Sequence, residues 1–145
     1  HNALALLVAR GNPLGITQLA DLSRADLRFA IAGPHVPAGD YARAALALAG
    51  VDARSRSDET SVRGVVQKVL LGELDAGIVY ASELHGRDFP LEFVSIPAAY
   101  QPTIRYPIVA LPQAEQPQLA AAFVNFVLSE TGQSILRTHG FSAAR

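Results

Sequence analysis

The 145-residue chain is 50% hydrophobic with a formal net charge of -1, so it can bury a sizeable core and lacks the basic surface of a nucleic-acid-binding protein. It has no cysteine, which excludes disulfides, zinc knuckles and thiol nucleophiles. No apolar run reaches the roughly 20 residues of a membrane-spanning helix. Because the chain has no methionine, we expect that it was processed, truncated or cut from a longer product and that something precedes His1.

The first third of the chain alternates strand and helix patterns. Residues 3–9 form a continuous apolar run, typical of an interior strand buried on both faces, as in parallel sheets. Residues 17–21 predict a short helix with a hydroxyl cap, and residues 27–32 predict a second strand. Residues 40–49 carry apolar side chains at helical spacing and end at a glycine, which predicts a helix.

The middle of the chain continues this alternation. Valine and leucine recur at helical spacing over residues 62–70, directly after a Thr-Ser pair suited to cap a helix. Residues 75–80 and 91–96 each predict a strand. The order of these patterns indicates an α/β sandwich.

The last third predicts one more strand and two helices. Residues 106–111 have strand character, and Pro107 favours an edge or a crossing segment. Residues 117–139 predict tandem helices with a break near Gly132. No repeat or long linker divides the chain.

Two of the predicted helix starts are candidate anion sites. Each follows a strand and a turn, and each leaves backbone NH groups unused, near residues 38–40 and 61–63. Ligands of open α/β sheets bind outside the carboxyl ends of the strands, where Tyr80 ends its own strand. Every helix start has such NH groups, however, so ordinary capping and a core tyrosine explain the same residues.

Catalytic patterns are missing. The four histidines lie in unrelated contexts, and neither HExxH nor Gly-x-Ser-x-Gly occurs. The Asp58-Glu59 pair precedes a predicted helix, where its charge suits the positive end of the helix dipole. Lys68, the only lysine, receives no role from its sequence context. We therefore assign no catalytic residue and no metal ligand.

Three segments carry a resemblance to a known family. They are residues 33–39 (GPHVPAG), 59–64 (ETSVRG) and 75–80 (DAGIVY), and their order and spacing resemble the periplasmic molybdate-binding proteins of ABC transporters. Residues 10–22 and 126–141 resemble the same family, so the likeness covers nearly the whole chain. The turn before Val36 is one residue shorter than in the family and lacks its usual aspartate.

The resemblance implies a three-layer α/β/α sandwich lobe of the type II periplasmic binding-protein fold. In that fold two lobes close on a dehydrated molybdate or tungstate. Residues 1–106 would form the second lobe with the first hinge-crossing strand, and residues 107–145 the return segment and C-terminal helices of an incomplete first lobe. Most of the first lobe, with its half of the anion shell, precedes His1 in the family's chain order.

The resemblance also implies the ligands. The oxyanion would be bound by the backbone NH groups of Ala38 and Val62 and by the hydroxyl of Tyr80. Gly39, Ser61 and Arg63 would support these donors. No cofactor is implied apart from the bound molybdate or tungstate, and sulfate should bind much less well. With half of the shell, we expect the chain alone to bind an anion weakly or not at all.

The expected function is the binding component of a molybdate or tungstate ABC importer, located in the periplasm, with a signal peptide upstream of His1 and a permease as partner. The alternatives are an oxyanion-sensing effector domain of a transcription regulator and a truncated receptor remnant. An enzyme is the least favoured class. The C-terminal helices should expose an apolar face that binds a second copy or a first-lobe fragment. That face comprises Phe123, Phe126, Val127, Ile135 and Leu136.

Overall fold

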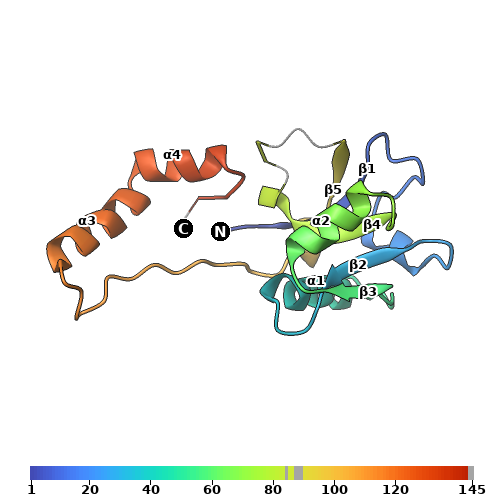
Figure 1. Cartoon of the computed structure of the whole chain (residues 1–145), viewed down its shortest axis with the longest axis horizontal. Coiled ribbons are helices and arrows are strands. Elements are labelled where there is room, and N and C mark those ends of the chain that lie inside the picture. The colour runs from blue at the N-terminus through green and yellow to red at the C-terminus, as the bar shows by residue number, and fades with distance from the viewer. Residues whose placement is uncertain (84, 87–89, 144–145) are drawn as a thin grey trace.

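The computed structural model describes residues 1–83, 85–86 and 90–143 (Figure 1). Within them, a five-stranded sheet has the strand order β3-β2-β4-β1-β5. Strands β2, β3 and β4 run parallel, whereas β1 is antiparallel to both of its neighbours. The strands are β1 (Leu4–Ala9), β2 (Phe29–Ala32), β3 (Ser57–Glu59), β4 (Ala76–Tyr80) and β5 (Leu91–Ser95).

Strand β1 confirms one expectation and corrects another. It lies between β4 and β5, as an interior strand should, with Leu4 opposite Tyr80 and Ala9 opposite Leu91. The expectation of parallel neighbours was wrong. Burial on both faces selects the same continuous apolar run whichever way the neighbours point, so the sequence pattern carries no information on direction.

Helices cover both faces of the sheet, which confirms the three-layer α/β/α sandwich. Helix α1 (Pro37–Leu48) packs on one face together with the 3-10 helices η1 (Leu19–Ser23) and η3 (Ala98–Tyr100). Helix α2 (Val62–Leu70) packs on the other face. Alternate residues of each strand supply the two cores. The first core includes Leu6, Phe29, Ile31, Leu46 and Ile78, and the second includes Leu7, Ala30, Val65, Val69 and Val79.

Several predicted boundaries move. Helix α1 begins at Pro37 rather than at residue 40, because proline already has a helical φ and is suited to the first position of a helix. The short helix expected at residues 17–21 is η1, two residues later, since the Asp21 carboxylate accepts hydrogen bonds from the backbone NH groups of Thr17 and Gln18. Strand β3 was not predicted.

An arm, defined as residues 105–143, leaves the sheet unit (residues 2–104) and returns to it. Residues 105–116 contain neither helix nor strand, so the strand predicted at residues 106–111 is wrong. Pro107 has no NH to donate, and Val109 is 75% exposed, with no neighbouring strand to pair with. Figure 1 shows the arm extending beside the sheet unit.

The arm carries helices α3 (Pro117–Leu128) and α4 (Glu130–Thr138). The break between them falls at Ser129, whose hydroxyl accepts the Gly132 NH at 3.2 Å and so caps α4. Gly132 lies three residues beyond the break and permits the tight corner, because a Cβ there would lie 2.1 Å from the Phe126 carbonyl oxygen. The two predicted helices are thus confirmed with a shifted boundary.

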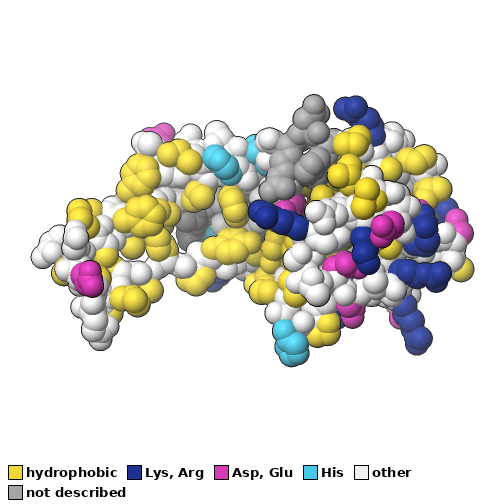
Figure 2. Space-filling view, viewed as in Figure 1, with side chains coloured by type: hydrophobic (Ala, Val, Ile, Leu, Met, Phe, Trp, Pro, Cys, Tyr) yellow, Lys and Arg dark blue, Asp and Glu magenta, His cyan; other side chains and the backbone are white. Residues whose placement is uncertain are grey.

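The arm is apolar and exposed. No residue of α3, all of which the structure describes, is buried, and Phe123 and Phe126 are 60% and 48% exposed. Figure 2 shows hydrophobic side chains gathered along the arm. In the described part of the chain no single helix is long and apolar enough to cross a membrane. Helices α3 and α4 meet that criterion only as a pair bent by 63°.

Candidate functional site

The three predicted donors meet at the carboxyl edge of the parallel strands. Strand β2 lies between β3 and β4, so the start of α1, the start of α2 and the end of β4 share one edge of the sheet. Ala38 and Val62 are buried in the same apolar cluster, and Tyr80 packs against it. The structure therefore brings Ala38, Val62 and Tyr80 together.

At the start of α1, one amide is left over. The amides of Gly39 and Asp40 donate to the Val36 carbonyl at 2.8 and 3.3 Å, and Pro37 has no NH. The Ala38 amide donates to no acceptor among the described residues. Ala38 itself is 1% exposed to solvent, so this donor belongs to a buried residue.

The role of Gly39 is to allow close packing of the backbone, since its own amide already donates to Val36. A Cβ at this position would lie 1.9 Å from the Ala32 carbonyl oxygen and 2.7 Å from that of Gly33. Only glycine lets the first turn of α1 approach the end of β2 this closely. The preceding turn is tight, with His35 in the left-handed region at φ 68°. Gly39 thus fixes where the Ala38 amide lies.

The start of α2 is arranged in a similar way. The Ser61 hydroxyl accepts the Gly64 NH at 3.2 Å, so its role is that of an N-cap. The Ser61 carbonyl accepts from Gly64 and Val65. The amides of Val62 and Arg63 have no acceptor among the described residues. The Arg63 side chain is exposed.

The two helix starts are linked through Glu59, the last residue of β3. The Gly33 NH, before α1, donates to the Glu59 carbonyl at 2.8 Å. The Glu59 carboxylate accepts from Lys68 Nζ at 2.7 Å and from Ser57 Oγ at 2.5 Å. The lysine hydrogen bond, followed by the serine one, lowers the pKa of Glu59 below its usual value. Sequence reasoning gave Glu59 only a helix-dipole role and Lys68 none.

Tyr80 remains a hydrogen-bond donor at neutral pH. Its ring is half-buried between the two apolar cores, and this burial raises the pKa of the phenol well above its usual value. The nearby hydroxyl of Tyr106, from the arm, adds to the increase. A neutral phenol that keeps its proton suits an acceptor-only ligand.

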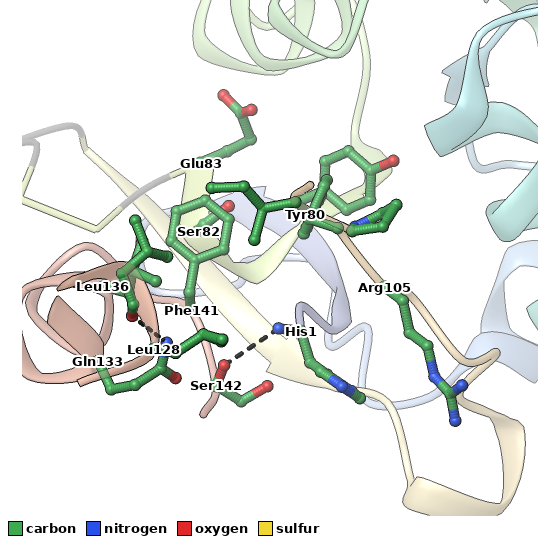
Figure 3. A pocket seen from close by; sticks show the side chains of 14 residues that line it. His1, Tyr80, Ser82, Glu83, Arg105, Leu128, Gln133, Leu136, Phe141 and Ser142 are labelled. Carbon is green, nitrogen blue, oxygen red and sulfur yellow. Dashed lines mark hydrogen bonds between the residues drawn. The ribbon is translucent and has the colours of Figure 1, made fainter. Parts of the chain in front are cut away.

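A cavity of about 720 Å³ separates the sheet unit from the arm (Figure 3). Tyr80, Ser82 and Glu83 line it from the sheet unit. Leu128, Gln133, Leu136 and Phe141 line it from the arm, largely with apolar surface. Of the three predicted donors only Tyr80 reaches this cavity, whereas Ala38 and Val62 lie outside it.

Asn2 joins the segments that cross between the sheet unit and the arm, and sequence reasoning missed it. Its side-chain NH₂ donates to Ser82 Oγ at 2.9 Å and to Tyr106 Oη at 3.3 Å. Asn2 also pairs with Ile104 in a short bridge. The only signal in the sequence was a polar residue directly before the apolar run at residues 3–9. In the structure Asn2 is 8% exposed.

Metal chemistry has no support within the described residues, where no group of three or more histidine, aspartate or glutamate side chains could hold a metal ion. The three predicted donors at the sheet edge are two backbone amides and a phenol, all uncharged. Such a set binds acceptor oxygens rather than cations. The fold and this edge define the class of ligand-binding lobes in which the ligand lies outside the carboxyl ends of parallel strands.

Comparison with known proteins places the chain within that class. Residues 1–142 match the family model of the bacterial extracellular solute-binding proteins, and the chain belongs to this family. The chain is 35% identical over 141 residues to the molybdate-binding protein ModA of Mycobacterium tuberculosis H37Rv, covering 97% of this chain and 54% of that protein. It thus spans about half the length of its curated relatives. These relatives are solute-binding proteins rather than enzymes.

Two solved structures show the same fold. The substrate-binding domain of a putative molybdenum ABC transporter from Clostridium difficile has a TM-score of 0.76 at 23% identity, covering 99% of this chain and 64% of that one. The periplasmic molybdate-binding protein of Azotobacter vinelandii has a TM-score of 0.68 at 17% identity, with coverage of 99% and 66%. The fold is therefore that of a type II periplasmic binding-protein domain.

Proposed function

We propose that the chain is one side of an extracytoplasmic receptor for a tetrahedral oxyanion, molybdate or tungstate, that serves an ABC importer. The observation that carries this proposal is one edge of the sheet, where Ala38 and Val62 share an apolar cluster against which Tyr80 packs. The amides of Ala38 and Val62 have no acceptor among the described residues, and the Tyr80 hydroxyl keeps its proton at neutral pH. The 35% identity to a protein named for molybdate binding supports the choice of ligand.

The donor set suits a fully deprotonated oxyanion. Molybdate and tungstate present only acceptor oxygens, and each donor at this edge brings a proton. The positive ends of the α1 and α2 dipoles add attraction for negative charge. Phosphate at neutral pH carries a hydroxyl that requires an acceptor, which disfavours it. Molybdate and tungstate have the same shape, so this edge cannot separate them strongly.

The proposal also assigns the parts of the chain. Residues 1–106 form the second lobe with its hinge-crossing strand, and residues 107–145 belong to the first lobe. The curated relatives contain a further stretch with no counterpart in these 145 residues. We propose that this stretch supplies the other half of the anion shell and covers the apolar face of α3 and α4. A permease would bind the assembled receptor.

Replacing Tyr80 by phenylalanine tests the proposal. The change removes one hydrogen bond to a charged ligand, so molybdate affinity should fall by about 1.5–3 kcal/mol, or roughly 10- to 150-fold. The matched control is Tyr100→Phe, which removes the hydroxyl of a partly buried tyrosine of η3 on the α1 face and should leave affinity unchanged.

Titration calorimetry at millimolar anion is the measurement, because one half of a shell should bind weakly. The expected order for the unmodified chain is molybdate and tungstate together, then sulfate. Equal affinities of Tyr80→Phe and the unmodified chain would refute the role of Tyr80. Binding of sulfate ahead of molybdate would refute the ligand.

A further inference from the structure

The only lysine of the chain lies in an ion pair beside the proposed anion site. Lys68, in the last turn of α2, places Nζ 2.7 Å from Glu59 Oε1. The side chains are 35% and 12% exposed, so the carboxylate is mostly shielded from water. The pKa of Glu59 is lowered by Lys68, and that of Lys68 is raised by Glu59. Both groups are therefore charged at neutral pH.

Glu59 lies against the first turn of α2. Its Cβ and Oε2 are both 3.4 Å from the place where a Cβ of Gly64 would be. Gly64 is the third residue of the helix that begins at Val62. The negative charge of Glu59 is thus within one helical turn of the Val62 amide.

This position creates an electrostatic conflict that Lys68 resolves. A buried carboxylate near the seat of a dianion would repel it, in a region where water screens poorly. The Lys68 ammonium cancels that charge without reaching the ligand itself. The backbone carbonyl of Glu59 also accepts a hydrogen bond from the Gly33 NH. Glu59 therefore cannot move away from the start of α1 without breaking this bond.

We propose that Lys68 is an affinity determinant of the oxyanion site, acting through neutralisation of Glu59. The inference rests on the proposed function and extends it to a residue that does not contact the ligand. Lys68 is a positioning and charge-cancelling residue in this scheme.

A second ion pair provides the matched control. Arg28 and Asp75 pair at 2.8 Å, and the Asp75 side chain is 14% exposed, close to the 12% of Glu59. Both residues directly precede parallel strands, β2 and β4, so this pair lies at the opposite edge of the sheet. Asp75→Asn breaks a comparable pair far from the proposed site.

The experiment measures molybdate affinity of the whole chain by titration calorimetry at low ionic strength. Lys68→Met leaves the charge of Glu59 without its ion-pair partner and should weaken binding roughly five- to tenfold, because the carboxylate then repels the anion. Asp75→Asn should bind like the unmodified chain. The double variant Glu59→Gln with Lys68→Met should recover the affinity, because it removes the uncompensated negative charge.

The outcomes separate this inference from the proposed function. If the unmodified chain shows no molybdate binding at any concentration tested, the oxyanion site proposed on this lobe fails and the inference fails with it. If the chain binds and Lys68→Met matches Asp75→Asn, the function stands and the inference is refuted. Should Lys68→Met not fold, Glu59→Gln alone decides: it removes the negative charge and should tighten binding, and weaker binding would contradict the proposal.

Discussion

The close approach of α1 to the end of β2 makes Gly39→Ala the most informative single substitution. A Cβ at Gly39 would lie 1.9 Å from the Ala32 carbonyl oxygen, and both nearest groups are backbone. A carbon and a carbonyl oxygen need about 3.3 Å, so the two backbones must separate by roughly 1.4 Å. No rotation of a side chain relieves this contact.

The expected loss of stability follows from the core contacts that this separation would weaken. The first two turns of α1 pack Ala38 and Ala42 in the two cores, at 1% and 0% exposure, and both contacts would loosen. Overpacking against backbone at this depth should lower the free energy of unfolding by at least about 3 kcal/mol. In a chain of this size that corresponds to a fall in Tm of about 10 °C.

Gly64→Ala is the control, since Gly64 is also the third residue of its helix. The added Cβ would be 3.4 Å from Glu59 and 3.7 Å from the Ser61 hydroxyl, both side-chain contacts. We expect a change between zero and a gain of about 1 kcal/mol. Urea unfolding followed by far-ultraviolet circular dichroism compares the two variants. A loss below about 1 kcal/mol in Gly39→Ala would refute the position given to the Ala38 amide.

Two further predictions concern the sheet edge and the arm. The hydrogen bond from the Arg28 side chain lowers the pKa of Asp75. The ionised carboxylate therefore stabilises the fold above about pH 4, and this contribution is lost as the pH falls through the lowered pKa. Asp75→Asn should lower the free energy of unfolding by about 1 kcal/mol at neutral pH and should make the variant lose less stability in acid than the unmodified chain. Urea unfolding at a series of pH values measures both, and parallel curves of stability against pH for the two proteins would contradict this prediction. Phe123 is 60% exposed on α3, so Phe123→Ser should change the free energy of unfolding by no more than about 0.5 kcal/mol. The same substitution should reduce self-association in analytical ultracentrifugation. A monomeric and strongly destabilised Phe123→Ser would contradict this, because it would show that α3 is covered within this chain.

Sequence patterns predicted the helices and strands best where the spacing of apolar residues fits only one type of secondary structure. The valines of α2 repeat at helical spacing behind a serine cap, and the helix lies where that pattern placed it. Strand β3 has the sequence Ser-Asp-Glu, which shows no apolar alternation, and only its pairing with β2 makes it a strand. Residues 106–111 have strand composition but no partner, so tertiary context overrode their propensity.

The site depended on information that no local pattern contains. Helix-start reasoning identified the regions of Ala38 and Val62, and the family motifs selected the individual residues. Their meeting at one edge follows from β2 lying between β3 and β4, an order that the sequence does not state. The pairing of Lys68 with Glu59 was out of reach for the same reason, because it exists only once β3 lies beside α2.

The most direct test of the oxyanion site is a nuclear magnetic resonance titration of the ¹⁵N-labelled chain with sodium molybdate. The amides of Ala38 and Val62 should shift more than any others, because each would donate a hydrogen bond to the anion. The amides at the start of α4, where Ser129 caps Gly132, provide an internal comparison and should remain nearly still. Shifts that are absent, or that are largest at α4 rather than at the ends of β2 and β3, would contradict the oxyanion site proposed for this lobe.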